Sequence, residues 1–376
     1  MKAGIYIHIP FCKTKCSYCN FSFVINYPKT LPERYTSALI REIASCSDPP
    51  LETVDTIYLG GGTPSNVTAE IIDRILSACR AQFQIAEDSE ITIEINPDTI
   101  TPEKARQYRK LGVNRASLGA QSFNDAELRA VGRSHRANHI LQAFEILRAE
   151  DFGNISLDLI IGLPRQTQDS WLNSLLQLRK LHPEHVSLYM LDLDRETRLG
   201  KDFDRGRTQL PDDELTSACF IDAISQLASD HYDHYEISNL ALAGWESRHN
   251  LKYWMDAPYY GFGASSHSYV DGLRFKVEPD PERYIEQINL TGSAVVERTA
   301  LSRERMRNEA FYLRLRRTEG VDLEAFDRIY HGSITDAHAE AIVRLTDAGL
   351  LIKEGGRLRL TPRGILLSNE VFQEFL

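Results

Sequence analysis

The chain has 376 residues, of which 42% are hydrophobic and 26% charged, and it carries a net charge of −10. This length predicts one large domain with a smaller one, and the acidic balance argues against nucleic-acid binding through a positive field of the whole protein. No apolar run reaches the roughly 18–20 residues of a membrane span, and the N-terminus lacks the apolar core of a secretory signal. We therefore expect a cytoplasmic protein without a membrane anchor.

The first 190 residues alternate between strand and helix patterns. The strand candidates are apolar and β-branched, and they cover residues 4–10, 55–62, 90–97, 115–121, 155–164 and 185–191. Amphipathic helix patterns lie between them, and this alternation predicts βαβ units around a parallel sheet. Six units fit an incomplete (β/α)6 barrel better than a complete eight-stranded one. An open doubly wound sheet is the alternative, because periodicity alone does not close a barrel.

The ends of these strands carry unusual residues. The chain reads "HIPFC", "GGGTP", "EINP", "GAQS" and "GLP" where successive strands end. In parallel α/β architectures, the loops that leave the carboxyl ends of the strands build the active site. We therefore expect the functional residues to gather at one rim of the sheet.

Three of the six cysteines, Cys12, Cys16 and Cys19, fall within eight residues after the first strand, with the spacing C-x3-C-x2-C. Structural zinc takes four ligands in closely spaced pairs, and the chain has no second CxxC. Thiolates also hold iron–sulfur clusters, and a [4Fe-4S] cluster bound by three cysteines leaves one iron open. Zinc bound by the three cysteines and an outside ligand is the alternative, and His8 is a further candidate for the fourth ligand. The scattered Cys46, Cys79 and Cys219 are expected to pack as small apolar residues.

The pattern changes after residue 191. Residues 214–229 predict a helix, and an aromatic and glycine-rich stretch follows at 248–269. From about residue 300 the chain predicts three helices and a hairpin that turns at Gly355 and Gly356, which together suggest a winged helix. Residues 300–376 carry 12 basic and 12 acidic side chains, so a packing or lid role is favoured over DNA binding. The predicted domains are residues 1–295 and 296–376.

The motifs together resemble a known superfamily. The cysteine triplet after the first strand, with Tyr18 before its third cysteine and "GGGTP" after the second strand, resembles the radical S-adenosylmethionine superfamily. The full set "YIHIPFC…CSYC…GGGTP…EINP…GAQSF…GLP" is similar to the branch that contains the oxygen-independent coproporphyrinogen III oxidases and the HemW heme chaperones. The resemblance spans essentially the whole chain. It implies an incomplete (β/α)6 radical-SAM barrel with a C-terminal winged-helix-like α+β domain.

The resemblance also implies roles for single residues. Cys12, Cys16 and Cys19 would hold a [4Fe-4S] cluster, whose open iron would be chelated by the amino and carboxylate groups of S-adenosyl-L-methionine (SAM). A carboxylate such as Glu94 pairs with an ammonium group, and glycine lets a backbone approach closely. The implied chemistry is reductive cleavage of the sulfonium to a 5′-deoxyadenosyl radical. The positions that match cofactor contacts are Tyr6, Tyr18, Gly61, Gly62, Thr63, Glu94, Gln121, Arg133 and Asp158.

Two activities compete within this branch. The oxidases carry a further cysteine two residues after the third ligand, where this chain has Phe21, and the chaperones carry an HNxxYW-type motif, matched here by "HNLKYW". His249, Asn250, Tyr253 and Trp254 are therefore the candidate heme-binding residues, with His267 as an alternative ligand and packing as the competing role for His249. The sequence favours a chaperone that binds heme and passes it to acceptor proteins. A coproporphyrinogen III dehydrogenase is the alternative, and a radical enzyme with another substrate is a third.

Overall fold

The structure is a computed structural model that describes residues 2–46 and 53–376. Six strands that pair in parallel, in chain order, form the centre of its larger sheet. They are β1 (Ala3–Ile9), β2 (Val54–Gly61), β3 (Ile85–Ile95), β4 (Arg115–Gln121), β5 (Ile155–Ile161) and β6 (His185–Met190). All six predicted strands are present, although β3 begins five residues earlier than its sequence pattern indicates.

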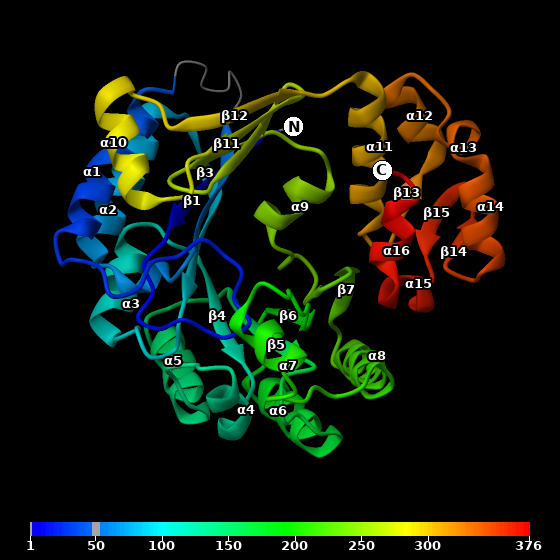
Figure 1. Cartoon of the computed structure of the whole chain (residues 1–376), viewed down its shortest axis with the longest axis horizontal. Coiled ribbons are helices and arrows are strands. Elements are labelled where there is room, and N and C mark those ends of the chain that lie inside the picture. The colour runs from blue at the N-terminus through cyan, green and yellow to red at the C-terminus, as the bar shows by residue number, and fades with distance from the viewer. Residues whose placement is uncertain (1, 47–52) are drawn as a thin grey trace.

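Helices cover the outer face of these strands (Figure 1). They are α1 (Leu31–Ala44), α2 (Ala69–Gln82), α3 (Pro102–Lys110), the short α4 (Asp125–Ala130), α5 (Ala137–Ala149) and α6 (Gln168–Leu181). Threonine side chains at residues 68, 101 and 167 accept a backbone N–H at the first turn of α2, α3 and α6, which fixes where each helix begins. Cys79 on α2 is fully buried in the core, as predicted.

The barrel formed by β1–β6 is open. Strand β6 pairs antiparallel with β8 (Asn239–Ala241), and β1 pairs in parallel with β9 (Tyr259–Phe262). Since β1 and β6 each have another neighbour, the order β12-β11-β10-β9-β1-β2-β3-β4-β5-β6-β8-β7 does not close on itself. The incomplete (β/α)6 barrel predicted from the sequence is confirmed.

The segment from 191 to 300 extends the sheet at both edges. Its strands include β7 (Asp233–Glu236), β10 (His267–Val270), β11 (Leu273–Val277) and β12 (Val295–Ala300), and its helices are α7 (Arg198–Asp204), α8 (Asp213–Ser229), α9 (Arg248–Trp254) and α10 (Pro281–Thr291). The α8 helix matches the sequence prediction. The added strands were not predicted, because runs of three to six residues rich in glycine and aromatic side chains have no clear period.

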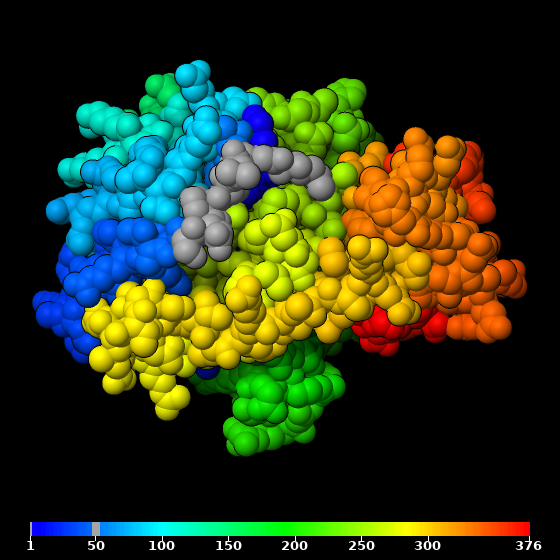
Figure 2. All heavy atoms as spheres, turned by 90° about the horizontal axis from the view of Figure 1, so that it is seen from above, coloured from blue at the N-terminus to red at the C-terminus, as the bar shows by residue number. Residues whose placement is uncertain are grey.

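Residues 301–376 gather at one end of the molecule (Figure 2). They form the helices α11 (Arg303–Leu315), α12 (Leu323–Tyr330), α13 (Ile334–Ala337), α14 (Ala339–Asp347), α15 (Pro362–Leu366) and α16 (Ser368–Gln373), and a small sheet of β13 (Val321–Asp322), β14 (Leu351–Glu354) and β15 (Arg357–Leu360). Phe311, Phe326 and Phe375 belong to a core that is separate from the barrel core. The hairpin turns at Gly355 and Gly356, as predicted, and both have positive φ.

We propose that the chain divides into residues 1–295 and 296–376, with β12 leading from the barrel to α11. Within residues 2–46 and 53–376, no helix is both long and apolar enough to cross a membrane.

Candidate functional site at the barrel rim

A cavity of about 340 Å³ lies at the carboxyl ends of the barrel strands. Its volume falls within the usual range of small-molecule sites. All three clustered cysteines line it, and so do all but one of the positions that match cofactor contacts: Tyr18, Gly61, Gly62, Thr63, Glu94, Gln121, Arg133 and Asp158. The carboxyl ends of five strands, β1 to β5, therefore bring the predicted residues to one place. The exposed side chain of Phe21 also lines the cavity.

The cysteine loop is closed on itself by backbone hydrogen bonds. Cys12 N donates to Val24 O at 3.0 Å, and Val24 N donates to Pro10 O at 2.7 Å. Midway along the loop, Ser17 N donates to Val131 O at 2.9 Å, which ties it to the segment after α4. With its backbone held at both ends and in the middle, the loop holds its three thiols against the cavity.

The three thiols are the kind of donor that iron–sulfur clusters use, and each thiolate of a cubane cluster binds a different iron. Among the described residues, no group of three His, Cys, Asp or Glu side chains has the geometry to hold a single metal ion. Burial raises the pKa of Cys12, and it raises the pKa of Cys19 to about 11. Both protons would leave when a metal binds.

His8 does not join the cysteines as a fourth ligand. Its ring is buried, with Nε2 at 2.8 Å from Ser22 O and Nδ1 at 3.1 Å from Tyr6 Oη. Both ring nitrogens therefore already have partners, and His8 ties β1 to the cysteine loop.

The glycine run at the end of β2 lets two backbones approach each other. Gly61 has φ +113°, a conformation that other residues rarely adopt. A Cβ atom on Gly62 would lie 2.7 Å from the carbonyl carbon of Pro10 and 3.0 Å from Cys12 Sγ. The chain then enters a short 3₁₀ turn at Pro64–Asn66. Glycine is therefore required where β2 passes beside the cysteine loop.

Glu94, near the end of β3, places a buried carboxyl group at the cavity. Its Oε1 accepts a hydrogen bond from Tyr58 Oη at 2.9 Å, and its Oε2 accepts one from Gly61 N at 3.2 Å. Burial raises the pKa of Glu94 to about 7, against the lowering effect of the Tyr58 hydroxyl. Tyr6, the candidate outside the cavity lining, lies against the Tyr58 ring with centroids 6.2 Å apart. A carboxyl group in this position is suited to pair with a ligand ammonium group.

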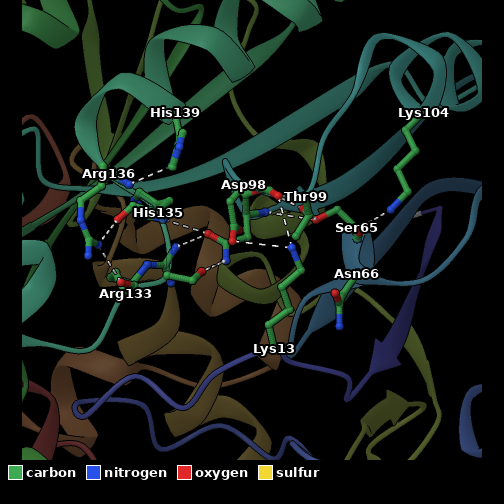
Figure 3. A network of polar contacts seen from close by, with 12 residues as sticks. Lys13, Ser65, Asn66, Asp98, Thr99, Lys104, Arg133, His135, Arg136 and His139 are labelled. Carbon is green, nitrogen blue, oxygen red and sulfur yellow. Dashed lines mark hydrogen bonds and ion pairs between the residues drawn. The ribbon is translucent and has the colours of Figure 1, made fainter. Parts of the chain in front are cut away.

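Arg133 is fixed by a polar network between two strand ends. Its Nη2 donates to Asn96 Oδ1 at 2.9 Å and to Gly119 O at 2.8 Å, while Nη1 donates to Cys16 Sγ at 3.6 Å. The buried His135 lies 3.0 Å from the same Asn96 oxygen, and burial lowers its pKa to about 3 (Figure 3). The neutral His135 thus orients Asn96, which in turn orients the guanidinium beside the cysteine thiol.

Asp158 on β5 is a second buried carboxyl group at the cavity. It accepts hydrogen bonds from Ser117 Oγ at 3.2 Å and from Ser156 Oγ at 3.3 Å. Burial raises its pKa, against the effect of these hydroxyl groups. Gln121, at the end of β4, has φ +66°, a strained conformation for a residue other than glycine. Both residues are held in place by the strands that carry them.

The sequence did not single out three residues that shape this cavity. Tyr58, Asn96 and Ser117 all line it. Asn96 belongs to the quoted "EINP" and follows β3 directly, so its position at a strand end was a usable signal. Tyr58 and Ser117 lie inside strands, and their direction depends on which strand face turns inward.

The "HNLKYW" motif lies at the opposite end of the barrel, on α9. His249 is buried, with Nδ1 at 2.9 Å from Thr56 Oγ1 and Nε2 at 2.9 Å from Tyr253 Oη. Its ring stacks on Tyr58 with centroids 5.2 Å apart. Burial lowers the pKa of His249 to about 3, so the imidazole is neutral. Both ring nitrogens have partners in this conformation.

Charged side chains hold α9 against the barrel base. Glu90 accepts the backbone N–H groups of Arg248 and His249 at 3.0 and 3.1 Å, next to the positive end of the helix dipole. Lys252 Nζ lies 2.5 Å from Asp55 Oδ1, and both side chains are largely buried. Asn250 and Trp254 are half-buried on the remaining faces of α9, whereas His267 lies exposed on β10. The four candidate heme-binding residues therefore share one helix, and the Tyr58 ring lies between His249 and the cavity that the cysteines line.

Family models match two parts of the chain. The model of the radical SAM superfamily matches residues 6–178, and the HemN C-terminal domain model matches residues 301–367. The first match contains the cysteine loop, the glycine run and the first five strands. A match to this superfamily implies an iron–sulfur cluster and SAM.

Similar proteins extend the likeness to the whole chain. The heme chaperone HemW of Bacillus subtilis is 35% identical over 99% of this chain and 98% of its own, and that of Lactococcus lactis is 34% identical over 99% and 96%. The solved coproporphyrinogen III oxidase of Escherichia coli superposes with a TM-score of 0.87 at 23% identity, over 100% of this chain and 90% of its own, which shows a shared fold. The chain belongs to the heme chaperone HemW family of radical SAM proteins.

Proposed function

We propose that this protein binds heme and transfers it to acceptor proteins, and that it carries a [4Fe-4S] cluster at which SAM binds. The observation that carries the proposal is the full-length likeness to relatives named heme chaperones. Phe21 stands where the oxidases of this branch carry a further cysteine. We place the transfer in the cytoplasm, a compartment in which clustered thiols serve as metal ligands rather than disulfides.

The cofactor half of the proposal uses the cavity at the rim. Cys12, Cys16 and Cys19 would bind the cluster, and Glu94 would pair with the ammonium group of SAM. The glycine run would present its backbone to the methionine end of the cofactor. Cluster and cofactor together would supply one-electron reductive chemistry. The remaining contacts are assigned to Tyr6, Tyr18, Thr63, Gln121, Arg133 and Asp158.

The heme half uses the motif on α9, with His249 as the iron ligand beside Asn250, Tyr253 and Trp254. A neutral imidazole is the form that binds a metal, and burial keeps His249 neutral. Its Nε2 is engaged by Tyr253 Oη, so binding of iron requires the hydroxyl to move away. A net contribution of about 0.5–1.5 kcal/mol for this hydrogen bond is small against a metal–ligand bond. Tyr253 therefore acts as a placeholder at the nitrogen that iron would occupy.

Heme titration of the reconstituted protein tests this assignment. Wild type should bind heme stoichiometrically with a shifted Soret band, and H249A should lose that spectrum while keeping its cluster. Because Y253F frees Nε2, it should bind heme about two- to tenfold more tightly. H267A is the matched histidine control and should behave as wild type. Unchanged affinity in H249A and Y253F would return His249 to a packing role, and no binding by wild type would refute the chaperone proposal.

The same reconstituted sample also tests the alternative function, a coproporphyrinogen III dehydrogenase. With SAM and a reductant present under anaerobic conditions, coproporphyrinogen III should be left unconsumed. Consumption of coproporphyrinogen would support the dehydrogenase instead.

A further inference from the structure

Buried donor groups without acceptors gather where α9 meets the C-terminal domain. Trp254 Nε1 and the Nε groups of Arg314, Arg316 and Arg317 have no hydrogen-bond partner among the described residues. Helix α9 contacts α11 here, between the barrel and the C-terminal domain (Figure 1). Buried polar groups in native proteins are nearly always paired. An excess of donors in one neighbourhood therefore indicates a place for an acceptor-rich group.

Arg316 is largely buried and weakly paired. Its guanidinium lies 4.2 Å from the centroid of the Trp254 ring, so the indole face supports it. The nearest carboxylate oxygen, on the fully buried Glu236, is 3.7 Å from Nη2, longer than a hydrogen bond. Burial lowers the pKa of Arg316, which is the sign of a cation that lacks sufficient compensating contacts. A further carboxylate could accept the hydrogen bonds that the Arg316 guanidinium does not make with Glu236.

Arg317 and Arg314 extend the same cationic group. Arg317 Nη1 donates to Met255 Sδ at 2.8 Å, and a thioether is a weak acceptor. Its carboxylate partner, Glu319 at 2.7 Å, is also 3.6 Å from Arg357. Arg314 lies over the Tyr330 ring at 5.5 Å, and the Tyr330 hydroxyl donates to Asp256 Oδ2 at 2.8 Å, so Arg314 has an acidic residue of its own nearby. Arg316 and Arg317 are therefore the two cations whose carboxylate contacts are long or shared with another arginine.

We propose that Arg316 and Arg317 bind the carboxylates of the tetrapyrrole that the α9 motif receives, an inference that rests on the heme-binding function proposed above. A guanidinium fork matches a carboxylate with two parallel hydrogen bonds. The rings of His249, Tyr253 and Trp254 follow one another with centroids 5.2 and 6.2 Å apart, so they form a continuous row from the imidazole to the indole that Arg316 covers. In this arrangement the His249 imidazole would bind the iron, and the two arginines would bind the carboxylates at the edge of the macrocycle. The C-terminal domain then supplies part of the binding site.

A comparison of heme with its dimethyl ester tests the proposal, because the ester keeps iron and macrocycle but has no free carboxylates. Both ligands are titrated into the reconstituted full chain. Removing Arg316 alone would leave Glu236 buried without its cation, so the variant is R316Q/E236Q, with E236Q as its control. R317Q is the second variant. R328Q, on the exposed side of α12, is the matched arginine control.

R316Q/E236Q and R317Q should bind heme about 10- to 100-fold more weakly than wild type, as expected for lost charge-assisted hydrogen bonds. Their affinity for the dimethyl ester should equal that of wild type. E236Q and R328Q should bind both ligands as wild type does. Unchanged heme affinity in both variants would overturn the inference, and so would an equal loss for the ester. Wild type that binds neither ligand would overturn the proposed function itself.

Discussion

Replacement of Glu94 by glutamine should show how much the charge of this side chain, as distinct from its shape, contributes to SAM affinity. The structure places the carboxyl group in a site where burial raises its pKa from 4.5 to about 7. At about 1.4 kcal/mol per pH unit, ionising this group in the folded protein costs about 3 kcal/mol more than in water. E94Q keeps the acceptor for Tyr58 and Gly61 but carries no charge. It should therefore bind SAM weakly and without pH dependence.

Wild type, by contrast, should bind SAM with an affinity that depends on pH. With a pKa of about 7, about a tenth of Glu94 is ionised at pH 6 and about half at pH 7, so SAM affinity should rise about fivefold over that interval. The raised pKa also means that the folded protein holds an extra proton between pH 4.5 and about 7. The contribution of Glu94 to stability is therefore full below pH 4.5 and is lost as the pH rises through 7.

The assay is anaerobic equilibrium dialysis of SAM with the cluster-reconstituted protein between pH 5.5 and 7, below the range in which the ligand's own amino group titrates. Glu42 offers a matched control. Burial raises its pKa to about 7 as well, and it accepts hydrogen bonds from the Tyr284 hydroxyl and from Gly263 N, away from the cavity. E42Q should leave the SAM profile unchanged. If E94Q keeps the pH dependence of wild type, Glu94 is not the group that meets the ammonium.

Three further outcomes can be checked. Serine at Cys12, Cys16 or Cys19 should abolish the iron and sulfide content and the brown absorption after reconstitution, whereas C79S should retain both; retained sulfide in the first three would refute the ligand assignment. G62A should assemble little cluster, because its Cβ would lie 2.7 Å from the Pro10 carbonyl carbon; G153A, where a Cβ meets nothing within 4 Å, is the control. D55N should lower the free energy of unfolding by about 3–5 kcal/mol in urea titrations, because it leaves Lys252 buried without its carboxylate; wild-type stability would show that the pair is solvated.

The rim of the barrel was predictable because its signals are local. Each strand pattern is followed directly by its functional residues, and the rule that carboxyl ends meet at one edge is enough to bring Cys12, Gly62 and Glu94 together. The hairpin at Gly355 was predictable for the same reason, since its turn residues lie between two short strand patterns. In these places, neighbouring residues in the chain decide the structure.

The position of α9 was not predictable from local signals. Its motif falls in the stretch described from the sequence only as aromatic and glycine-rich, and no local pattern predicts that His249 contacts Thr56 or that Glu90 caps the helix. Those contacts depend on which side chains of β2 and β3 face inward at the amino ends of the strands. The strands β9–β12 were missed for a related reason, because their pairing depends on the edge that β1 offers. Here tertiary contacts, and not periodicity, select the structure.

The arrangement around Tyr58 bears on whether radical chemistry reaches the heme. Thr56 and Tyr58 lie on the same inward face of β2, about 7 Å apart. Thr56 contacts His249, while the Tyr58 hydroxyl reaches Glu94. The Tyr58 ring, stacked on His249, therefore separates the α9 motif from the cofactor cavity. An oxidase must bring its tetrapyrrole substrate to the cofactor, inside the cavity. In the proposed function heme lies on the other side of Tyr58, so it can be held and released without meeting the radical.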